Sequence, residues 1–264
     1  MAAEINVTAR TGPPAATTAD TRVVGVFEAD ICPVGPIARL VESGELKASF
    51  KHVGVAHAHQ ARYIVIGLGK AEAFTPERAR VLAAVACGRA AEIGAKSLSW
   101  ELPDAGEPAS IAGALVEGTL LKAYKFDRFK TKRDAGDEDA ADGLVSLEIA
   151  SREADVSAAV HAAAAGARAV NRARDLQNLP SNVATPSFLG DRAAEIAAGH
   201  ENVEFEIHDR DWIERKGMGA FTAVARGTAE EPQLIELRYN GAGANGPTLG
   251  FVGKAVTFDT GGIS

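Results

Sequence analysis

The first half of the chain alternates between apolar runs of strand length and stretches with helical periodicity. Residues 22–27 are a strand candidate, and the apolar, β-branched run at residues 62–67 predicts a strand buried in a parallel sheet. Helices are expected at residues 37–43, 76–93 and 111–122, and a last strand at 144–149. The clearest helix start is Thr75-Pro76-Glu77, which supplies a capping hydroxyl, a proline at the first position and an acid in the first turn. Because strands and helices alternate, the pattern indicates an α/β domain with a mainly parallel sheet.

A long helical pattern separates this region from the rest of the chain. Apolar residues recur at helical spacing from Asp155 to Leu179, and Pro180 ends the helix. We place a domain boundary before this helix, which gives domains of residues 1–150 and 151–264. In the second domain, Thr185-Pro186 and Asp209 predict helix starts. Strands are expected at residues 203–207, 233–239 and 248–252.

Composition and charge argue against several classes of protein. Hydrophobic residues make up 46% and charged residues 24% of the chain, which is typical of a soluble globular protein with a sizeable core. The net charge of −7 argues against a chain that coats nucleic acid or anionic membrane, since such binding needs a cationic surface. No stretch has the length of a membrane span or the pattern of a signal peptide, so a cytoplasmic location is expected. Cys32 and Cys87 lack C-x-x-C spacing and are expected to be buried, reduced thiols.

Several short motifs resemble sites but lack the partners that their chemistry needs. Gly67-Leu68-Gly69-Lys70 lies between a strand and a helix, but Glu72 stands where a dinucleotide loop needs glycine, which favours a tight turn. His57 and His59 would share one face of an extended segment, yet no nearby carboxylate or cysteine completes a metal site, which favours a solvated loop. The other candidates are single histidines, serines outside a nucleophile elbow and a short basic cluster followed by acids, at His161, His200, His208, Ser181, Ser187 and residues 130–133.

The last residues of the chain carry the most specific chemistry. Lys254 follows the predicted strand at 248–252, Asp259 comes five residues later, and Gly261-Gly262 follows. Asp259 offers hard carboxylate oxygens to a divalent cation, and the two glycines let the backbone pass close to it. An ammonium at Lys254 would repel the ion, so this lysine would either bind it as a neutral amine or point elsewhere. Spacing alone favours the plainer interpretation, a surface lysine followed by an aspartate-glycine turn.

These residues also resemble the signature of a known family, the leucyl (cytosol) aminopeptidases or M17 peptidases, which use two metal ions. The resemblance rests on Gly253–Ser264 and continues upstream in the family's order, at Glu117-Gly118, Tyr124–Asp127, Asn178–Asn182, Thr185-Pro186, Lys216–Phe221, Arg226–Thr228 and Pro232–Tyr239. It is strong from about Glu117 to Ser264 and diffuse before that. One residue departs from the pattern: Ala255 stands where the family usually has glycine, which puts tight packing in doubt and leaves ligation unaffected.

The resemblance implies a macro-domain-like α/β domain at the N-terminus, followed by the beginning of a second, catalytic α/β domain. It implies an aminopeptidase that releases N-terminal amino acids from peptides with water activated by two divalent ions, Mn²⁺ or Zn²⁺. Lys254 and Asp259 would be two of five metal ligands. The remaining ligands, a catalytic lysine and a catalytic arginine would lie beyond Ser264. The implied substrates are peptides with a free N-terminus, and the implied assembly is a homo-hexamer.

We therefore expect the chain to be the N-terminal part of a longer enzyme. Alone it should be inactive, because the site is incomplete, and poorly soluble, because strand edges and the apolar stripe of the long helix would lack their later partners. The alternative is a non-catalytic binding or assembly module derived from an aminopeptidase.

Overall fold

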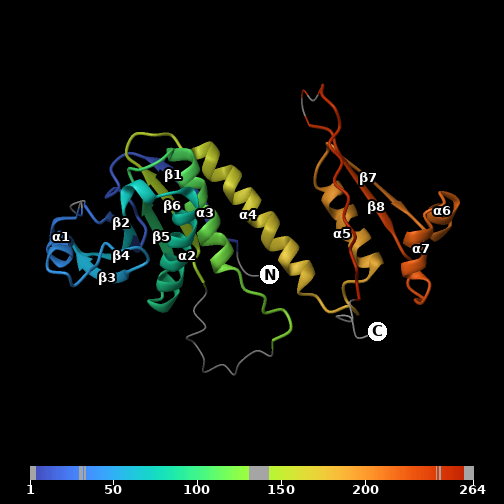
Figure 1. Cartoon of the computed structure of the whole chain (residues 1–264), viewed down its shortest axis with the longest axis horizontal. Coiled ribbons are helices and arrows are strands. Elements are labelled where there is room, and N and C mark those ends of the chain that lie inside the picture. Colours follow the sequence, from blue (N-terminus) through green and yellow to red (C-terminus); the bar gives the residue numbers. More distant parts are fainter. Residues whose placement is uncertain are drawn as a thin grey trace. The chain divides into compact units, whose positions relative to one another are not determined.

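The computed structural model describes residues 4–29, 32, 34–130, 143–241, 243 and 245–258. The chain divides into two compact units, residues 1–175 and residues 176–264. Figure 1 shows both units.

A six-stranded sheet forms the centre of the first unit. Its strands are β1 (Asn6–Thr11), β2 (Thr21–Phe27), β3 (Val53–Ala58), β4 (Ala61–Gly69), β5 (Ser97–Glu101) and β6 (Ser146–Ser151). They lie in the order β1-β6-β5-β2-β4-β3. Every neighbouring pair is parallel except β3 and β4, which form an antiparallel hairpin at one edge. The predicted α/β class with a mainly parallel sheet is confirmed.

Helices cover both faces of this sheet (Figure 1). The larger core lies between the sheet and three helices, α2 (Pro76–Glu92), α3 (Pro108–Ala123) and α4 (Ser157–Gln177). Trp100, Leu82 and Leu115 are fully buried in it. On the opposite face a smaller core forms around α1 (Gly35–Glu42), and a short 3₁₀ helix, η1 (Ala71–Ala73), follows β4. Burial of both faces explains why β2 and β4 appear in the sequence as nearly continuous apolar runs.

Local signals in the sequence fix where α2 begins and how it packs. The Thr75 hydroxyl accepts a hydrogen bond from the Arg78 backbone N–H at 3.3 Å, and the first helical residue is proline, as predicted. Gly118 lets α3 approach α2 closely, since a Cβ there would lie 2.1 Å from the Arg80 carbonyl oxygen. The Arg80 guanidinium also pairs with the Glu117 carboxylate at 2.7 Å. The two helices are therefore held in tight contact by a small residue and an ion pair side by side.

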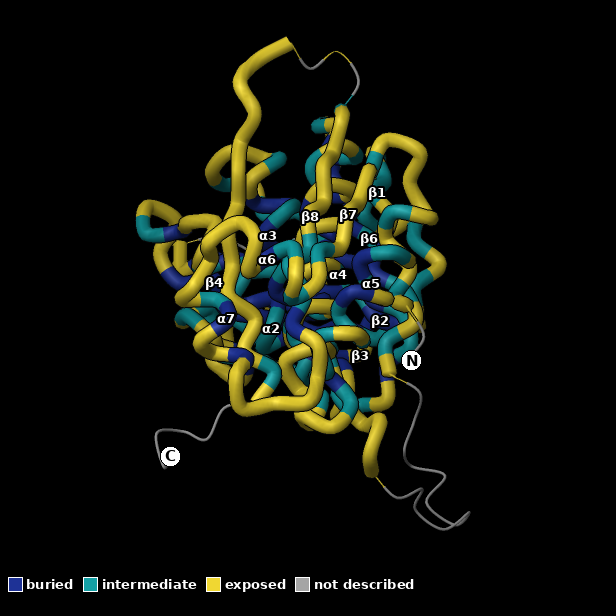
Figure 2. The backbone as a smooth tube through the Cα atoms, turned by 90° about the vertical axis from the view of Figure 1, so that its right-hand side faces the viewer, coloured by how far each residue is buried: buried dark blue, intermediate teal, exposed yellow. Residues whose placement is uncertain are grey.

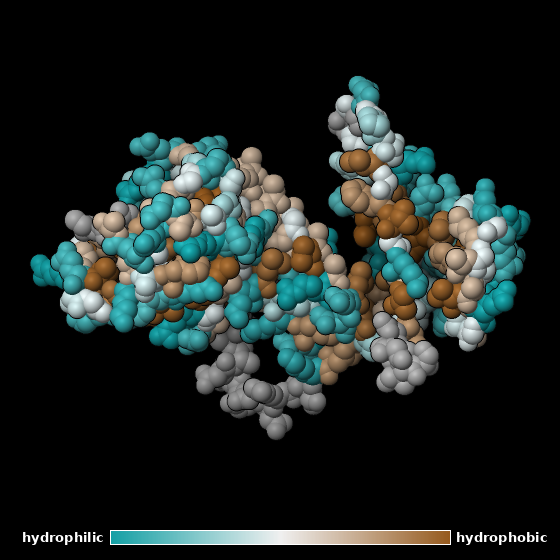
Figure 3. Space-filling view, viewed as in Figure 1, coloured by the Kyte–Doolittle hydropathy of each residue, from teal (hydrophilic) through white to brown (hydrophobic). Residues whose placement is uncertain are grey.

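The described residues of the second unit form a two-stranded antiparallel sheet and three helices. Its elements are α5 (Pro186–Ala198), β7 (Val203–His208), α6 (Arg210–Arg215), α7 (Gly219–Ala225) and β8 (Leu234–Tyr239). Thr185 caps α5 and Asp209 caps α6, both as predicted. Helix α5 packs against β7 and β8. Figure 3 shows apolar side chains at the surface of this unit. Phe205, Ile207 and Leu237 are among its exposed apolar residues.

The strand predicted at residues 248–252 is wrong for the described structure. Residues 245–258 form neither helix nor strand, and most of the segment is exposed (Figure 2). Phe251 is 93% exposed and Val252 is fully exposed. An apolar run becomes a strand only where a neighbouring strand accepts its backbone hydrogen bonds, and the described sheet of this unit consists of β7 and β8.

The predicted boundary between residues 150 and 151 falls inside β6, one residue before its end, and precedes α4. Residues of α4, among them Val160 and Ala164, are buried in the core of the first unit. The two compact units divide later, after Asp175, so the position of the domain boundary stays a prediction. Within the described residues, no helix is both long and apolar enough to span a membrane.

Candidate functional site

The predicted metal ligands lie at the end of the chain. Lys254 is exposed in the irregular segment that follows β8. Asp259 lies outside the described residues, as do Gly261 and Gly262. The pairing of the Lys254 amine with the Asp259 carboxylate around a metal ion therefore stays a prediction.

A second group of metal-ligating side chains lies on the β7–β8 sheet. Glu206 of β7 stands directly opposite Glu236 of β8, and His208 is two residues further along β7 on the same face. The His208 Nε2 atom lies 3.5 Å from a Glu206 carboxylate oxygen and 4.0 Å from a Glu236 carboxylate oxygen. One ligand atom of each residue lies within 4.8 Å of those of the other two. We call these three residues the Glu-His-Glu cluster.

The neighbours of His208 hold its imidazole in place. Its ring stacks on the Trp212 indole, with the centroids 3.8 Å apart and the planes inclined by 11°. Trp212 is fixed in turn, because its backbone N–H donates to the capping Asp209 carboxylate at 2.8 Å. The His208 side chain is 12% exposed, whereas those of Glu206 and Glu236 reach solvent. The cluster thus combines one oriented imidazole with two accessible carboxylates.

The interpretation of His208 as a histidine without partners is wrong. The predicted strand at residues 203–207 includes Glu206 and ends before His208, whereas β7 continues through His208 and places both side chains on one face. Glu236 could not be added from the sequence, because its position opposite Glu206 depends on the register of β7 with β8.

The structure does not bring the other histidine pair together as ligands. His57 lies in β3, opposite Arg62 of β4. His59 lies in the tight turn after β3 with a positive φ of 48°, so the extended backbone that would align the two imidazoles ends before it. Both residues are exposed, as expected of a solvated segment.

The glycine motif after the second predicted strand is part of a close-packed strand end. Strand β4 continues through Gly69, whose φ of 77° favours glycine. A Cβ on Gly67 would lie 2.1 Å from the Ser49 carbonyl oxygen. These glycines therefore allow a turn and a close backbone contact, in agreement with the predicted tight turn.

The remaining candidates gain no catalytic partner from the described residues. Ser187 lies in the first turn of α5, and Ser181 lies in a turn before it. Lys130 pairs with Asp127, whereas residues 131–133 lie outside the described part of the chain. His161 and His200 are exposed.

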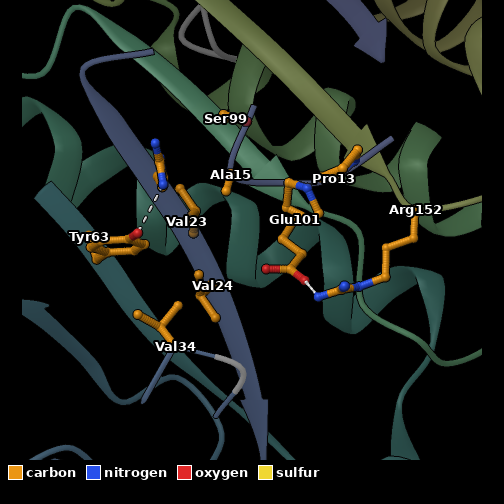
Figure 4. A pocket seen from close by; sticks show the side chains of 11 residues that line it. Pro13, Ala15, Val23, Val24, Val34, Tyr63, Ser99, Glu101 and Arg152 are labelled. Atoms are coloured by element: carbon orange, nitrogen blue, oxygen red, sulfur yellow. Dashed lines mark hydrogen bonds and ion pairs between the residues drawn. The ribbon is translucent and has the colours of Figure 1, made fainter. Parts of the chain in front are cut away.

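A cavity of about 230 Å³ lies in the first unit (Figure 4). Its wall combines valines and prolines with Arg22, Tyr63, Glu101 and Arg152. The Arg152 guanidinium pairs with the Glu101 carboxylate, and the Arg22 Nη1 donates to the Tyr63 hydroxyl at 3.0 Å. The Arg22 Nε is buried without a hydrogen-bond partner. Among the described residues that line the cavity, Arg22 is the cation without an ion-pair partner.

The described residues that line this cavity include no activated nucleophile. Ser99 lines it and donates to the Glu148 carboxylate at 2.7 Å, but no histidine is among the lining residues. The nearby Cys32 is buried, which raises the pKa of its thiol, and the Glu101 charge raises that pKa further. Burial likewise raises the pKa of the Cys87 thiol to about 11. Neither thiol is poised as a thiolate at neutral pH.

Two family models match separate parts of the chain. The N-terminal domain of the cytosol aminopeptidase family matches residues 23–133. The catalytic domain of the same family matches residues 171–264. Together they cover more than half of the chain, in the order that the resemblance in the sequence implied.

Curated relatives agree with the family models. A probable cytosol aminopeptidase of Roseiflexus castenholzii is 33% identical, over 98% of this chain and 54% of the relative. A probable cytosol aminopeptidase of Ralstonia pickettii is 35% identical, over 94% of this chain and 54% of the relative. The chain thus spans about half the length of the curated relatives that it matches.

Solved structures show the same fold. A mutant of tomato leucine aminopeptidase matches with a TM-score of 0.83 and 22% identity, over 98% of this chain and 56% of its own. The bottromycin maturation enzyme BotP in complex with Mn matches with a TM-score of 0.70 and 25% identity, over 85% of this chain and 46% of its own. Since two domain models of one family match in sequence order and solved structures share the fold, the chain belongs to the cytosol aminopeptidase family.

Proposed function

We propose that the whole protein is a metal-dependent leucyl aminopeptidase that releases N-terminal amino acids from peptides. One observation carries the proposal: in a chain of this family, Asp259 follows Lys254 by five residues, and Gly261 and Gly262 come shortly after it. The aminopeptidase names of the curated relatives support the reaction class.

Each residue of the motif has a distinct proposed role. The Asp259 carboxylate and the Lys254 side chain, the latter as a neutral amine, would hold the divalent ions. Bound ions of this kind polarise a scissile carbonyl and lower the pKa of a bound water. Lys254 and Asp259 provide two donors, which is fewer than a two-metal site needs, so further carboxylates, a catalytic lysine and a catalytic arginine are proposed to follow Ser264.

The same donors are compatible with more than one divalent ion. A carboxylate and an amine suit both Mn²⁺ and Zn²⁺. The Mn-bound state of BotP, a fold relative, supports Mn²⁺ as the first ion to test. The proposal includes a homo-hexameric assembly. It also includes a cytoplasmic location, which is supported by the name cytosol aminopeptidase that the relatives carry.

The test is hydrolysis of leucine amide with added Mn²⁺ by the complete product of the source gene. We expect activity that a chelator removes and that Mn²⁺ restores. Asp259→Asn and Lys254→Ala should each abolish it, because each removes a metal ligand. Asp211→Asn and Lys216→Ala, which make the same chemical changes on and just after α6, should leave the activity unchanged.

The same assay on the 264-residue chain distinguishes the two functions considered for it. We expect no hydrolysis, because the proposed site is incomplete. Activity of the 264-residue chain that survives Asp259→Asn would show that the catalytic centre lies elsewhere. A complete gene product without metal-dependent hydrolysis would favour a binding or assembly module instead.

A further inference from the structure

The Glu-His-Glu cluster places two like charges in an unfavourable arrangement. Glu206 and Glu236 are directly opposite on neighbouring strands, where two carboxylates repel each other. Arg238 compensates Glu236 in part, because its guanidinium lies 3.1 Å from Oε1 of that carboxylate. The Oε2 atom of Glu236 is the one that faces His208. Among the described residues, no lysine or arginine forms an ion pair with Glu206.

The imidazole of His208 is positioned as a ligand to a cation between these carboxylates. Its Nε2 faces one oxygen of each glutamate, at 3.5 Å and 4.0 Å. Stacking on Trp212 restricts rotation of the ring, so the nitrogen is held toward the carboxylates before any ion binds. Such preorganisation reduces the free-energy cost of assembling a metal site.

We propose that Glu206, His208 and Glu236 form a Zn²⁺ site on the β7–β8 sheet. Ligands about 2.1 Å from a tetrahedral ion lie about 3.4 Å apart. The longest separation within the cluster, at most 4.8 Å, closes to that value through small side-chain rotations of the two exposed glutamates. One imidazole and two carboxylates suit zinc, whereas Mg²⁺ and Ca²⁺ prefer oxygen donors alone. The three ligands leave a fourth position for water.

The ligands of this site are different residues from those of the motif proposed for catalysis. All three ligands lie in regular strands, whereas Lys254 belongs to the irregular segment after β8. The zinc site stands whether or not the whole protein is an aminopeptidase, because it rests on the geometry of β7 and β8 alone. Binding of zinc there would join the two strands across their most repulsive pair.

The test is zinc binding by the 264-residue chain carrying Asp259→Asn, which removes the carboxylate of the other motif. Competition with a chromophoric zinc indicator at low micromolar protein measures both stoichiometry and affinity. We expect one zinc ion per chain. Glu206→Gln, His208→Gln and Glu236→Gln should each weaken binding by at least about tenfold, because each removes a ligand.

Glu204→Gln is the matched control. Glu204 lies on the same strand and the same face, but its carboxylate accepts a hydrogen bond from the Asn240 side chain at 3.2 Å and is outside the cluster. This variant loses the same charge and should keep the zinc affinity. Circular dichroism of all four variants checks that the substitutions leave the fold intact.

A second readout reports on the location of the ion. Co²⁺ bound at His208 should quench the emission of Trp212, whose ring is stacked on the imidazole. The chain with Trp212→Phe emits from Trp100 alone, and this emission is subtracted from that of the parent chain to give the emission of Trp212. The proposal is overturned if Glu206→Gln and Glu236→Gln bind zinc as tightly as their parent chain, or if the parent binds no zinc, or if Co²⁺ leaves Trp212 emission unchanged.

Discussion

Replacement of Gly118 by alanine should destabilise the first unit, although alanine is the better helix former. Gly118 lies inside α3 where that helix meets α2. A Cβ at this position would lie 2.1 Å from the Arg80 carbonyl oxygen and 2.9 Å from the Ala83 Cβ. The nearest obstacle is backbone, so the two helices must separate, by about 1 Å, to reach ordinary contact distances.

The magnitude follows from two opposing terms. Alanine is favoured over glycine in a helix interior by about 1 kcal/mol. Overpacking a close contact costs about 1–3 kcal/mol, and a backbone obstacle puts Gly118 at the upper end of that range. The net loss should be about 2 kcal/mol. Gly113 of the same helix is the matched control, since its Cβ would lie 3.6 Å from the nearest atom, an ordinary contact. Gly113→Ala should therefore stabilise the unit, by up to about 1 kcal/mol.

Urea unfolding measures both variants. Trp100 is fully buried in the first unit, so its fluorescence in a Trp212→Phe background reports on that unit. With an m value of about 2 kcal/mol/M, Gly118→Ala should lower the unfolding midpoint by about 1 M. Gly113→Ala should leave it unchanged or raise it. If the two variants unfolded at the same urea concentration, the close approach of α2 and α3 would not be the reason for a glycine at position 118.

Two further predictions concern titratable groups. Burial opposes ionisation of Asp20, but hydrogen bonds from Thr21, from Arg62 and from the backbone of Lys96 and Ser97 outweigh it and lower the pKa of its carboxyl. Asp20→Asn should therefore cost about 1 kcal/mol of stability at pH 7, a modest value for a partly exposed group. The cost should fade as the pH falls through the lowered pKa, below the ordinary 3.8; a cost that persists in acid would contradict it. The Cys87 thiol, with a pKa of about 11, should resist a thiol reagent at pH 7 until urea unfolds the chain, and rapid labelling of the native chain would contradict its burial.

The elements with strong local signals could be predicted from the sequence. Thr75-Pro76-Glu77 and Thr185-Pro186 mark helix starts because a capping hydroxyl and a proline act within one turn. Strand β4 was recognisable because both of its faces are buried, so its apolar residues are continuous.

The elements that depend on distant partners could not be predicted. Strand β1 has a polar sequence and was not predicted; it lies at the edge of the sheet beside β6. Strands β3 and β5 were also missed. The reverse error occurred at residues 248–252, where an apolar run predicted a strand and the described structure has none. In each case the outcome depends on a neighbouring strand that the local sequence does not specify.

The candidate sites divide in the same way. The motif of Lys254 and Asp259 could be recognised because its chemistry is contained in a few adjacent residues. The Glu-His-Glu cluster combines residues of two strands, and only their register brings Glu236 to Glu206. A shift of one residue in that register would turn Glu236 to the other face of the sheet.

The position of β1 has a consequence for how the protein is made. Its partner is β6, and the Arg10–Glu148 ion pair that joins these strands links residues 138 positions apart. During synthesis β2, β3 and β4 can pair once residue 69 has emerged, whereas β1 must wait for residues 146–151. Closing so long a loop slows the final step of folding. The first strand to leave the ribosome should thus be the last to join the sheet. In a nascent chain shorter than 146 residues, β1 lacks the strand β6 with which it pairs.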